Sequence, residues 1–248
     1  AGGGNGNSDS RMGNYDGPNL NNASRYGAGG GGIVMLPNYF YAFDSVDTRR
    51  DVTLTHYQVN NSTNIKSQRR LGELNTGKYR RDWRVPLLPG TVLNVGYNWA
   101  MIRFSDVLLM LAEAENEINS PNAAAYNAIN MVRRRGFGKP ISTPDVTVDI
   151  PSGLSKTEFF KYLVRERALE LGGEGIRKYD LIRWNLLGTA ITETRNNLNR
   201  MAIATAMTQT TYMAAYPSYS LVSTLPVAMY LKTGNTADDF NIWANSYY

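Results

Sequence analysis

Cysteine is absent from the chain of 248 residues, and His56 is the single histidine. Without cysteine, neither a disulfide framework nor a thiolate metal site can form. Zinc sites and Ser/His/Asp triads both depend on histidine, and no G-x-S-x-G nucleophile motif accompanies His56. We therefore expect no metal, no cofactor and no hydrolase of the triad type.

Long apolar runs and blocks of like charge are missing too. No run of about 18 apolar residues occurs, so no transmembrane helix is expected. The net charge of +5 is spread along the chain without a zinc-finger or homeodomain pattern, which argues against a nucleic-acid partner. The opening residues, AGGGNGNSDS, lack an initiator methionine and a signal-peptide pattern, so any targeting segment is expected upstream or already removed.

The first 97 residues predict loops and short strands. Glycine, asparagine and serine dominate residues 1–32. The glycine runs are neither followed by G-K-[ST] nor placed between a strand and a helix, so a nucleotide-binding loop is not expected. Residues 33–97 contain short β-favouring pieces, such as DVTLTHYQV at 51–59, between turn residues. We expect 1–97 to be one loop-rich region with short strands.

Helical periodicity begins at Asn98 and continues to about Asn119. The expected apolar stripe of this helix consists of Phe104, Val107, Leu108, Leu111 and Ile118. Leu109 and Ala112 widen it, so the helix is expected to pack on two neighbours. A second helix is predicted from Ser120 as N-cap and Pro121 as first helical residue to Gly136. The short link predicts an antiparallel pair of helices.

A third helix is predicted to open at Ser155, which forms a capping box with Glu158, and to stop at Gly172–Gly173. Residues 98–187 are thus expected to form a core of helical hairpins, and 188–248 to hold one helix at about 190–204 and then irregular chain. The predicted fold class is mainly α.

Arg167 lies inside the apolar stripe of the third helix, seven residues after Phe160, where an unpaired guanidinium would be heavily penalised. It therefore needs a carboxylate from another helix or from the turn at 174–180. Glu166 and Glu170 share one face, and like charges at that spacing destabilise a helix unless cations face them. The candidate cations are Arg103, Arg133, Arg135, Arg177 and Arg183.

Paired carboxylates also occur in glycoside hydrolases, where two acids flank the scissile bond at a separation of roughly 5–10 Å. Those acids project into a cleft, whereas the pairs Glu113/Glu117 and Glu166/Glu170 are predicted in mid-helix. Neighbouring arginines would keep them ionised instead of raising a pKa for acid catalysis. A structural ion-pair network is therefore preferred to an active site.

Three segments occur in series: NWAMIRFSDVLLMLAEAENEI (98–118), AINMVRRRGFG (128–138) and FFKYLVRERALELGGEGIRKYDLIRW (159–184). In order and spacing they resemble the C-terminal half of the SusD/RagB family of nutrient-binding lipoproteins of the Bacteroidetes outer membrane. An earlier segment, YFYAFDSVDTRRDVTLTHY (39–57), resembles the extended D-x-R segment that precedes them in the family.

The resemblance implies tetratricopeptide-like helix pairs in an α/α superhelix. It also implies a protein without catalytic activity that holds a glycan, or in some members a peptide, at the cell surface beside a TonB-dependent, SusC-like transporter. The residues that match family positions, which we expect to form a structural ion-pair network, are Arg103, Glu113, Arg133, Glu166, Arg167, Glu170, Glu174, Arg177, Asp180 and Arg183.

The sequence departs from the family pattern, because the lipid-anchor cysteine, the N-terminal helical half and the closing motif are not in it. The expectation is therefore one fragment of a larger SusD-like domain, with an outer-membrane location inherited from the resemblance alone. One face of the helices at 98–135 should then be bare or covered by another chain.

A glycan site needs flat aromatic platforms and polar groups for the hydroxyls, usually on loops. The loop-rich region supplies both, and Trp83 stands among charged neighbours. Our candidate ligand-binding residues are Tyr39, Tyr41, Tyr57, Trp83, Asp44 and Asn60. Trp99 and Trp184 border helices and are expected in the core. A peptide-binding protein on the same scaffold, a helical-repeat interaction scaffold and an enzyme are the alternatives.

Overall fold

The computed structural model describes residues 12–44, 46–69, 71–88, 90 and 95–204. They fall into two compact units. The unit that we call the mixed unit comprises the described residues of 1–42, 53–98 and 181–248, and the unit that we call the helical unit comprises 43–52 and 99–180. The three-part division of the chain expected from the sequence stays a prediction.

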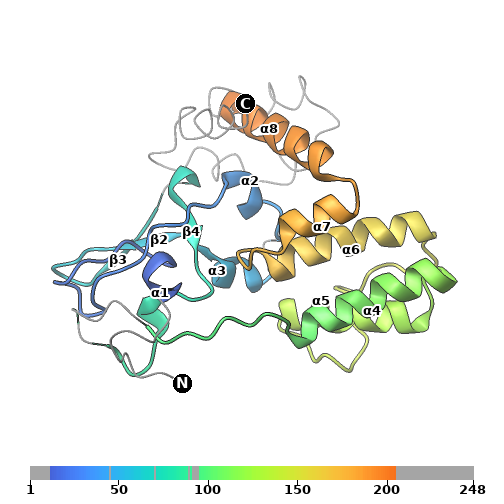
Figure 1. Ribbon diagram of the computed structural model, residues 1–248, viewed down its shortest axis with the longest axis horizontal. Coiled ribbons are helices and arrows are strands. Elements are labelled where there is room, and N and C mark those ends of the chain that lie inside the picture. Colours follow the sequence, from blue (N-terminus) through green and yellow to red (C-terminus); the bar gives the residue numbers. More distant parts are fainter. Residues whose placement is uncertain (1–11, 45, 70, 89, 91–94, 205–248) are drawn as a thin grey trace. The chain divides into compact units, whose positions relative to one another are not determined.

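Three long helices, lying side by side, make up most of the helical unit (Figure 1). They are α4 (Phe104–Asn119), α5 (Ala123–Gly136) and α6 (Lys156–Leu171), and α4 packs on both of the others. Small alanines on α4 and α5 let the helix axes approach closely, and larger side chains from α6 fill the remaining space. The buried apolar residues that pack together in this core cluster are Leu109, Ala112, Ala125, Ala128, Ile129, Val132, Ile150, Phe159 and Leu163.

The ends of α6 follow the sequence signals. The Ser155 side chain accepts from the backbone N–H of Glu158, and the Glu158 carboxylate accepts from the backbone N–H of Ser155, which confirms the capping box. The helix ends at Leu171, immediately before Gly172. The described part of the chain continues with α7 (Arg177–Arg183), a short helix.

The predicted start of α5 is wrong. Its cap is Asn122, whose Oδ1 accepts a hydrogen bond of 3.0 Å from the backbone N–H of Ala125. The Asn122 side-chain amide also donates to Glu115 at 2.6 Å, which ties the cap to the end of α4. Ser120 has φ 59°, outside the extended conformation that an N-cap requires, so its hydroxyl does not cap α5.

Replacing Asn122 by alanine removes both of these hydrogen bonds. We expect Asn122→Ala to lower the free energy of unfolding by about 1–2 kcal/mol in urea titrations. Asn127→Ala, at an exposed position of the same helix, is the matched control and should be neutral or slightly stabilising. An unchanged midpoint for Asn122→Ala would contradict its role as the cap.

The apolar stripe predicted for α4 is wrong in part. Leu109 and Ala112 are buried and α4 packs on two helices, as expected, but the rest of the buried face consists of Ser105, Asp106 and Asn116. Polar partners explain this rotation: the Asp106 carboxylate accepts from Arg167, and the Asn116 amide donates to the backbone carbonyl of Lys156. If α4 were turned so that the apolar stripe were buried, Asp106 and Asn116 would face solvent. The buried Arg167 would then lack one of its counter-ions.

Most of the predicted stripe lies on the outside of α4, where it forms an exposed apolar row, whereas Leu108 is partly buried against the core. Phe104 is 67% exposed and Ile118 is 78% exposed. Val107, Met110 and Leu111 lie between them and are each more than 40% exposed. The expectation of a bare apolar face on the helices at 98–135 is therefore confirmed on α4. In helical-repeat folds such a face is where a further helix pair packs.

Short strands and turns make up the N-terminal part of the mixed unit. Its elements, with α3 shared between the units, are α1 (Met12–Tyr15), α2 (Pro37–Phe40), α3 (Arg49–Thr53), β1 (Leu54–Thr55), β2 (Tyr57–Val59), β3 (Lys66–Gln68), η1 (Leu71–Glu73), β4 (Asn75–Thr76) and η2 (Arg81–Trp83). The strands form two antiparallel pairs, β1 with β4 and β2 with β3. The strand expected at 51–59 is divided, because residues 51–53 end α3.

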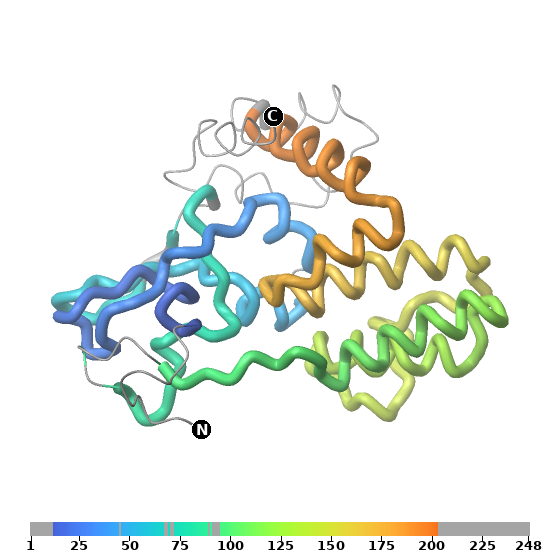
Figure 2. The backbone as a smooth tube through the Cα atoms, in the orientation of Figure 1, coloured from blue at the N-terminus to red at the C-terminus, as the bar shows by residue number. Residues whose placement is uncertain are grey.

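The turn between β2 and β3 lies beside the glycine-rich segment (Figure 2). Side-chain oxygens of Asn61 and Asn64 accept from the backbone N–H groups of Asn21 and Arg25, each at 2.9 Å. Residues far apart in the sequence are thereby joined by hydrogen bonds from backbone N–H groups to side-chain oxygens.

A final helix, α8 (Leu187–Ala204), closes the described chain and contacts α2 within the mixed unit. Its Leu198 and Met201 are fully buried. The helix expected at about 190–204 is thus confirmed, and the irregular chain expected after it lies outside the described residues. None of the helices in the described ranges is both long and apolar enough to cross a bilayer.

Candidate functional site

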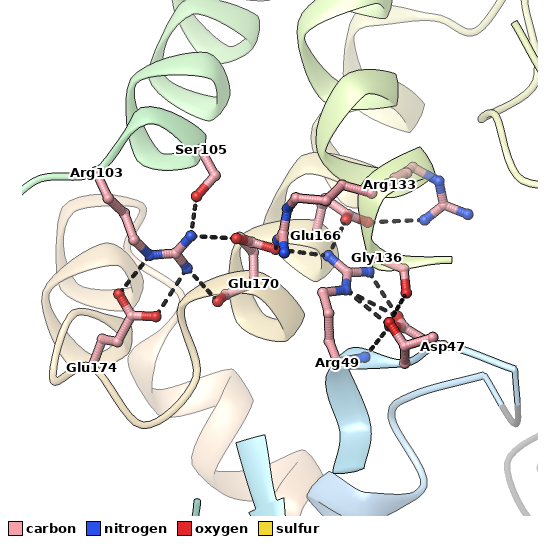
Figure 3. Close-up of polar contacts among 11 residues, drawn as sticks. Asp47, Arg49, Arg103, Ser105, Arg133, Gly136, Glu166, Glu170 and Glu174 are labelled. Carbon is pink, nitrogen blue, oxygen red and sulfur yellow. Dashed lines mark hydrogen bonds and ion pairs between the residues drawn. The ribbon is translucent and has the colours of Figure 1, made fainter. Parts of the chain in front are cut away.

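Two clusters of polar and charged residues stand out, one in each unit. The first lies inside the helical unit and is centred on Arg49, at the start of α3 (Figure 3). The Arg49 guanidinium pairs with Asp47 at 2.7 Å, Glu166 at 2.6 Å and Glu170 at 3.1 Å. The backbone of α5 passes so close that a Cβ on Gly136 would lie 2.3 Å from Arg49 Nε. Glycine at the end of α5 therefore makes room for the guanidinium.

Three further arginines surround the same two glutamates of α6. Arg103, the residue before α4, makes two hydrogen bonds of 2.9 Å with Glu174 and also pairs with Glu170. Arg133 pairs with Glu166 at 2.9 Å, and Arg135 pairs with Glu170. The like charges of Glu166 and Glu170 are thus offset by cations from other elements, as their spacing predicts.

Arg167 forms a separate buried cluster. Its guanidinium donates to Asp180 at 2.7 and 3.1 Å and to Asp106 at 2.8 Å, with only 4% of the side chain exposed. The prediction that Arg167 pairs with a carboxylate from another helix or from the turn at 174–180 is confirmed. The α4 partner Asp106 was not anticipated, because the sequence pattern placed the other face of α4 inside.

The remaining members of the expected network lie elsewhere. Arg177 donates to the backbone carbonyl of Val164 at 2.9 Å, and the Arg183 guanidinium lies 4.4 Å from the ring centroid of Trp184. Glu113 is half-buried on α4. Asp47 and Arg49 belong to the network although they were not among its expected members; the D-x-R pattern at 47–49 is the sequence signal that points to them. The ion pair of 2.5 Å between Arg134 and Asp149 was not expected either.

The chemistry of the helical cluster is that of a fixed ionic structure. Although burial opposes it, the positive charges of Arg103 and Arg135 lower the pKa of Glu170. A general acid needs a pKa raised towards the working pH, so the shift runs the wrong way for acid catalysis. Among the residues that the structure describes, no group of carboxylates or histidine could hold a metal ion.

The second cluster lies in the mixed unit and surrounds Trp83, the last residue of η2. The indole is 47% exposed, and the Arg80 guanidinium lies 3.9 Å from its ring centroid. Arg80 is itself buried and donates to the backbone carbonyls of Gly77 at 2.7 Å and Leu54 at 3.2 Å. A cation held this firmly against one face of the indole fixes the ring while leaving part of it open to solvent.

Asp82, next to Trp83, joins two more side chains to the cluster. The Tyr57 hydroxyl donates to Asp82 Oδ2 at 2.5 Å, and Lys66 Nζ pairs with the same oxygen at 2.7 Å. Lys66 Nζ also lies 4.2 Å from the Tyr57 ring centroid. Although burial opposes it, the hydrogen bond that Lys66 donates to Asp82 raises the pKa of Lys66, so the ammonium stays charged at neutral pH.

The structure brings together only two of the candidate ligand-binding residues, Tyr57 and Trp83. Tyr41 is 4% exposed, so the expectation that its ring is a platform for a ligand is wrong. Tyr39 is half-buried on α2.

The two polar candidates are used locally in turns. Asp44 accepts from the backbone N–H of Val46 at 3.2 Å, and Asn60 accepts from those of Ser62 and Thr63 at 3.0 Å.

Both tryptophans expected in the core are less buried than predicted. Trp99 is 43% exposed, so that expectation is wrong, and Trp184 is half-buried. The segment from Trp99 to Ile102 precedes the first turn of α4, and its side chains face solvent with the exposed row of that helix.

Comparison with known proteins decides the family. The sequence model described as the SusD family matches residues 1–248. The chain belongs to the SusD family. The SusD-like protein P25 of Formosa agariphila is 36% identical over 115 residues, which cover 46% of this chain and 20% of that protein. The SusD-like protein P2 of the same organism is 28% identical over 168 residues, covering 65% of this chain and 33% of that protein.

A solved SusD homologue from Bacteroides thetaiotaomicron has the same fold, with a TM-score of 0.68 and 29% identity over 80% of this chain. The mainly α-helical fold predicted for this SusD-family chain is therefore confirmed. The match covers 42% of the solved chain. This SusD-family chain spans between a fifth and a third of the length of its two curated relatives.

Proposed function

We propose that this SusD-family protein binds an oligosaccharide without cleaving it, on the surface around Trp83. One observation carries the proposal: an exposed indole is held in place by the buried Arg80 guanidinium, beside a hydrogen-bonded group of Tyr57, Asp82 and Lys66. Sugars present flat C–H faces and hydroxyl edges. A rigid ring with adjoining donors and acceptors is complementary to both.

Tyr57 is better suited to positioning than to stacking. Its hydroxyl is committed to Asp82, and the Lys66 ammonium lies over its ring. We propose Trp83 as the contact for the sugar face and Lys66 as a hydrogen-bond donor to the sugar edge. The ammonium has three N–H donors, and Asp82 takes one of them.

Replacing the indole tests the proposal. Trp83→Ala should weaken binding of the cognate oligosaccharide by about 1–3 kcal/mol in isothermal titration calorimetry, because the ring is one of few rigid contacts. The melting temperature should change little, since the ring is half open to solvent. Trp99→Ala removes a ring of similar exposure from the helical unit and serves as the matched control. Undiminished binding by Trp83→Ala would rule out this surface.

A separate measurement tests whether the protein cleaves the oligosaccharide. Incubation of the purified protein with the bound oligosaccharide should release no reducing sugar. Glu166 and Glu170 are buried and paired with arginines, which leaves neither of them suited to donate a proton to a leaving group.

Delivery of the glycan to a SusC-like TonB-dependent transporter at the outer membrane is the second part of the proposal. It rests on family membership and on the likeness to the SusD homologue of Bacteroides thetaiotaomicron. Digestion of the protein by protease added to intact cells would support a surface location. Co-purification of the SusC-like protein with the tagged protein from outer membranes would support the partnership, and failure of both would exclude it.

A further inference from the structure

Cations and aromatic rings alternate along the surface that includes Trp83. We call this set the cation–aromatic row, and it consists of Arg25, Tyr26, Lys66, Tyr57, Arg80 and Trp83. Lys66 Nζ lies between two rings, 5.7 Å from the centroid of Tyr26 and 4.2 Å from that of Tyr57. The guanidinium of Arg25 lies 5.1 Å from the Tyr26 centroid. Each ring of the row is therefore in contact with at least one positive charge.

Three members of the row are accessible. Arg25 is exposed, 38% of the Lys66 side chain is exposed, and Trp83 is 47% exposed. Arg80 is buried and supports the indole from within. Among the residues that the structure describes, no carboxylate forms an ion pair with Arg25. The row thus offers two cations and one flat ring to a ligand.

The chain around the cation–aromatic row also carries more positive than negative side chains. The described residues of 12–42 and 53–98 contain seven lysines and arginines but three aspartates and glutamates. Two of those three acids, Asp16 and Asp82, are buried. Positive side chains therefore outnumber negative ones in the described chain around the row, and such an excess favours anionic ligands over cationic ones.

We propose that the cation–aromatic row binds an acidic oligosaccharide, one that carries carboxylate or sulfate-ester groups. The proposal rests on the proposed function and adds the chemical class of the glycan. The C–H face of one sugar lies on Trp83, and the anionic substituent of the same or the next sugar is bound by Lys66 and Arg25. A neutral glycan would contact the ring but leave Arg25 without a counter-charge and Lys66 with Asp82 as its single anionic partner.

Paired probes that share a backbone test the charge directly. Oligogalacturonate and its fully methyl-esterified form differ in the carboxylate, and κ-carrageenan oligosaccharides and their desulfated form differ in the sulfate ester. In isothermal titration calorimetry with the purified protein at low salt, the acidic member of at least one pair should bind about tenfold more tightly or better. That ratio should shrink as the salt concentration rises, because the interacting charges are exposed.

Two charge-neutralising variants locate the contact. Arg25→Gln and Lys66→Gln should each weaken binding of the acidic probe by roughly three- to tenfold and leave the neutral probe almost unaffected. Arg25→Gln is the cleaner variant, since Lys66 also pairs with Asp82. Lys161→Gln, at an exposed position of α6, removes the same charge from the helical unit and should change neither affinity.

The outcomes separate this proposal from the one on which it rests. Equal affinity for the acidic and neutral members of both pairs overturns the acidic class and leaves glycan binding standing. Tight binding of the acidic probe that survives both Arg25→Gln and Lys66→Gln overturns the row as the site. Binding of a polyglutamate peptide with no binding of any of the four oligosaccharides overturns both proposals.

Discussion

Truncating Arg167 to alanine is expected to lower the free energy of unfolding by about 3–5 kcal/mol. The physical reason is that the two carboxylates that pair with Arg167 stay buried after the truncation. Asp106 and Asp180 are 6% and 3% exposed, so removal of the guanidinium leaves two carboxylates buried without their shared cation. Urea titration followed by circular dichroism measures the loss.

Matched variants show whether the loss is due to charge. Arg165→Ala, at an exposed position of the same helix, should cost less than about 1 kcal/mol. Arg167→Met keeps much of the volume and should be nearly as destabilising as Arg167→Ala. Adding Asp106→Asn and Asp180→Asn to Arg167→Met should recover part of the loss, because the buried charges are then gone. A loss that persists in full would show that packing, not charge, dominates.

Glu170→Gln is expected to have a comparable effect at neutral pH, roughly 3–5 kcal/mol. The carboxylate, with 1% of its side chain exposed, pairs with three arginines: Arg49, Arg103 and Arg135. A neutral amide offers one oxygen in place of two and leaves these guanidinium groups with less negative charge to face. Glu117→Gln, on the exposed side of α4, is the matched control and should cost less than about 1 kcal/mol.

The effect of Glu170→Gln should depend on pH in a definite direction. The pKa of Glu170 in the folded protein lies below its ordinary value of 4.5. At a pH between the pKa of the folded protein and the ordinary pKa, Glu170 is protonated in the unfolded chain but still ionised in the folded protein. The stabilisation by this carboxylate is therefore complete above the ordinary pKa and is lost as the pH falls further. The difference between wild type and Glu170→Gln should therefore narrow below about pH 4.5. A difference that widens in acid would contradict the assigned shift.

The ion pairs serve specificity more than net stability. Buried ion pairs often add little compared with well-packed apolar residues, whereas loss of one partner is costly. Here the pairs join the residues at 47–49, the ends of α4 and α5, and the C-terminal half of α6. A register shift of α6 would separate several charges at once, so the network selects one way of stacking the helices.

The sequence by itself determined the long helices and their family. The capping box at Ser155, the glycines after Leu171 and the charged motif of α6 are local signals, and each depends on residues within a few positions of one another. The need of Arg167 for a carboxylate followed from its place in an apolar stripe, which is also a local property. Such features are decided by backbone geometry before any tertiary contact forms.

Only the tertiary structure decided which surfaces face inward. On α4 an apolar stripe lies outside because the pairing of Asp106 with Arg167 turns the opposite face towards α6, and periodicity carries no information about a partner 61 residues away. In the mixed unit the exposure of Trp83 and the burial of Tyr41 depend on where distant segments pack, because loop-rich chain has no period to follow. Long-range ion pairs and loop packing are properties of the folded chain, which explains why the sequence predicted the helices but not their buried faces.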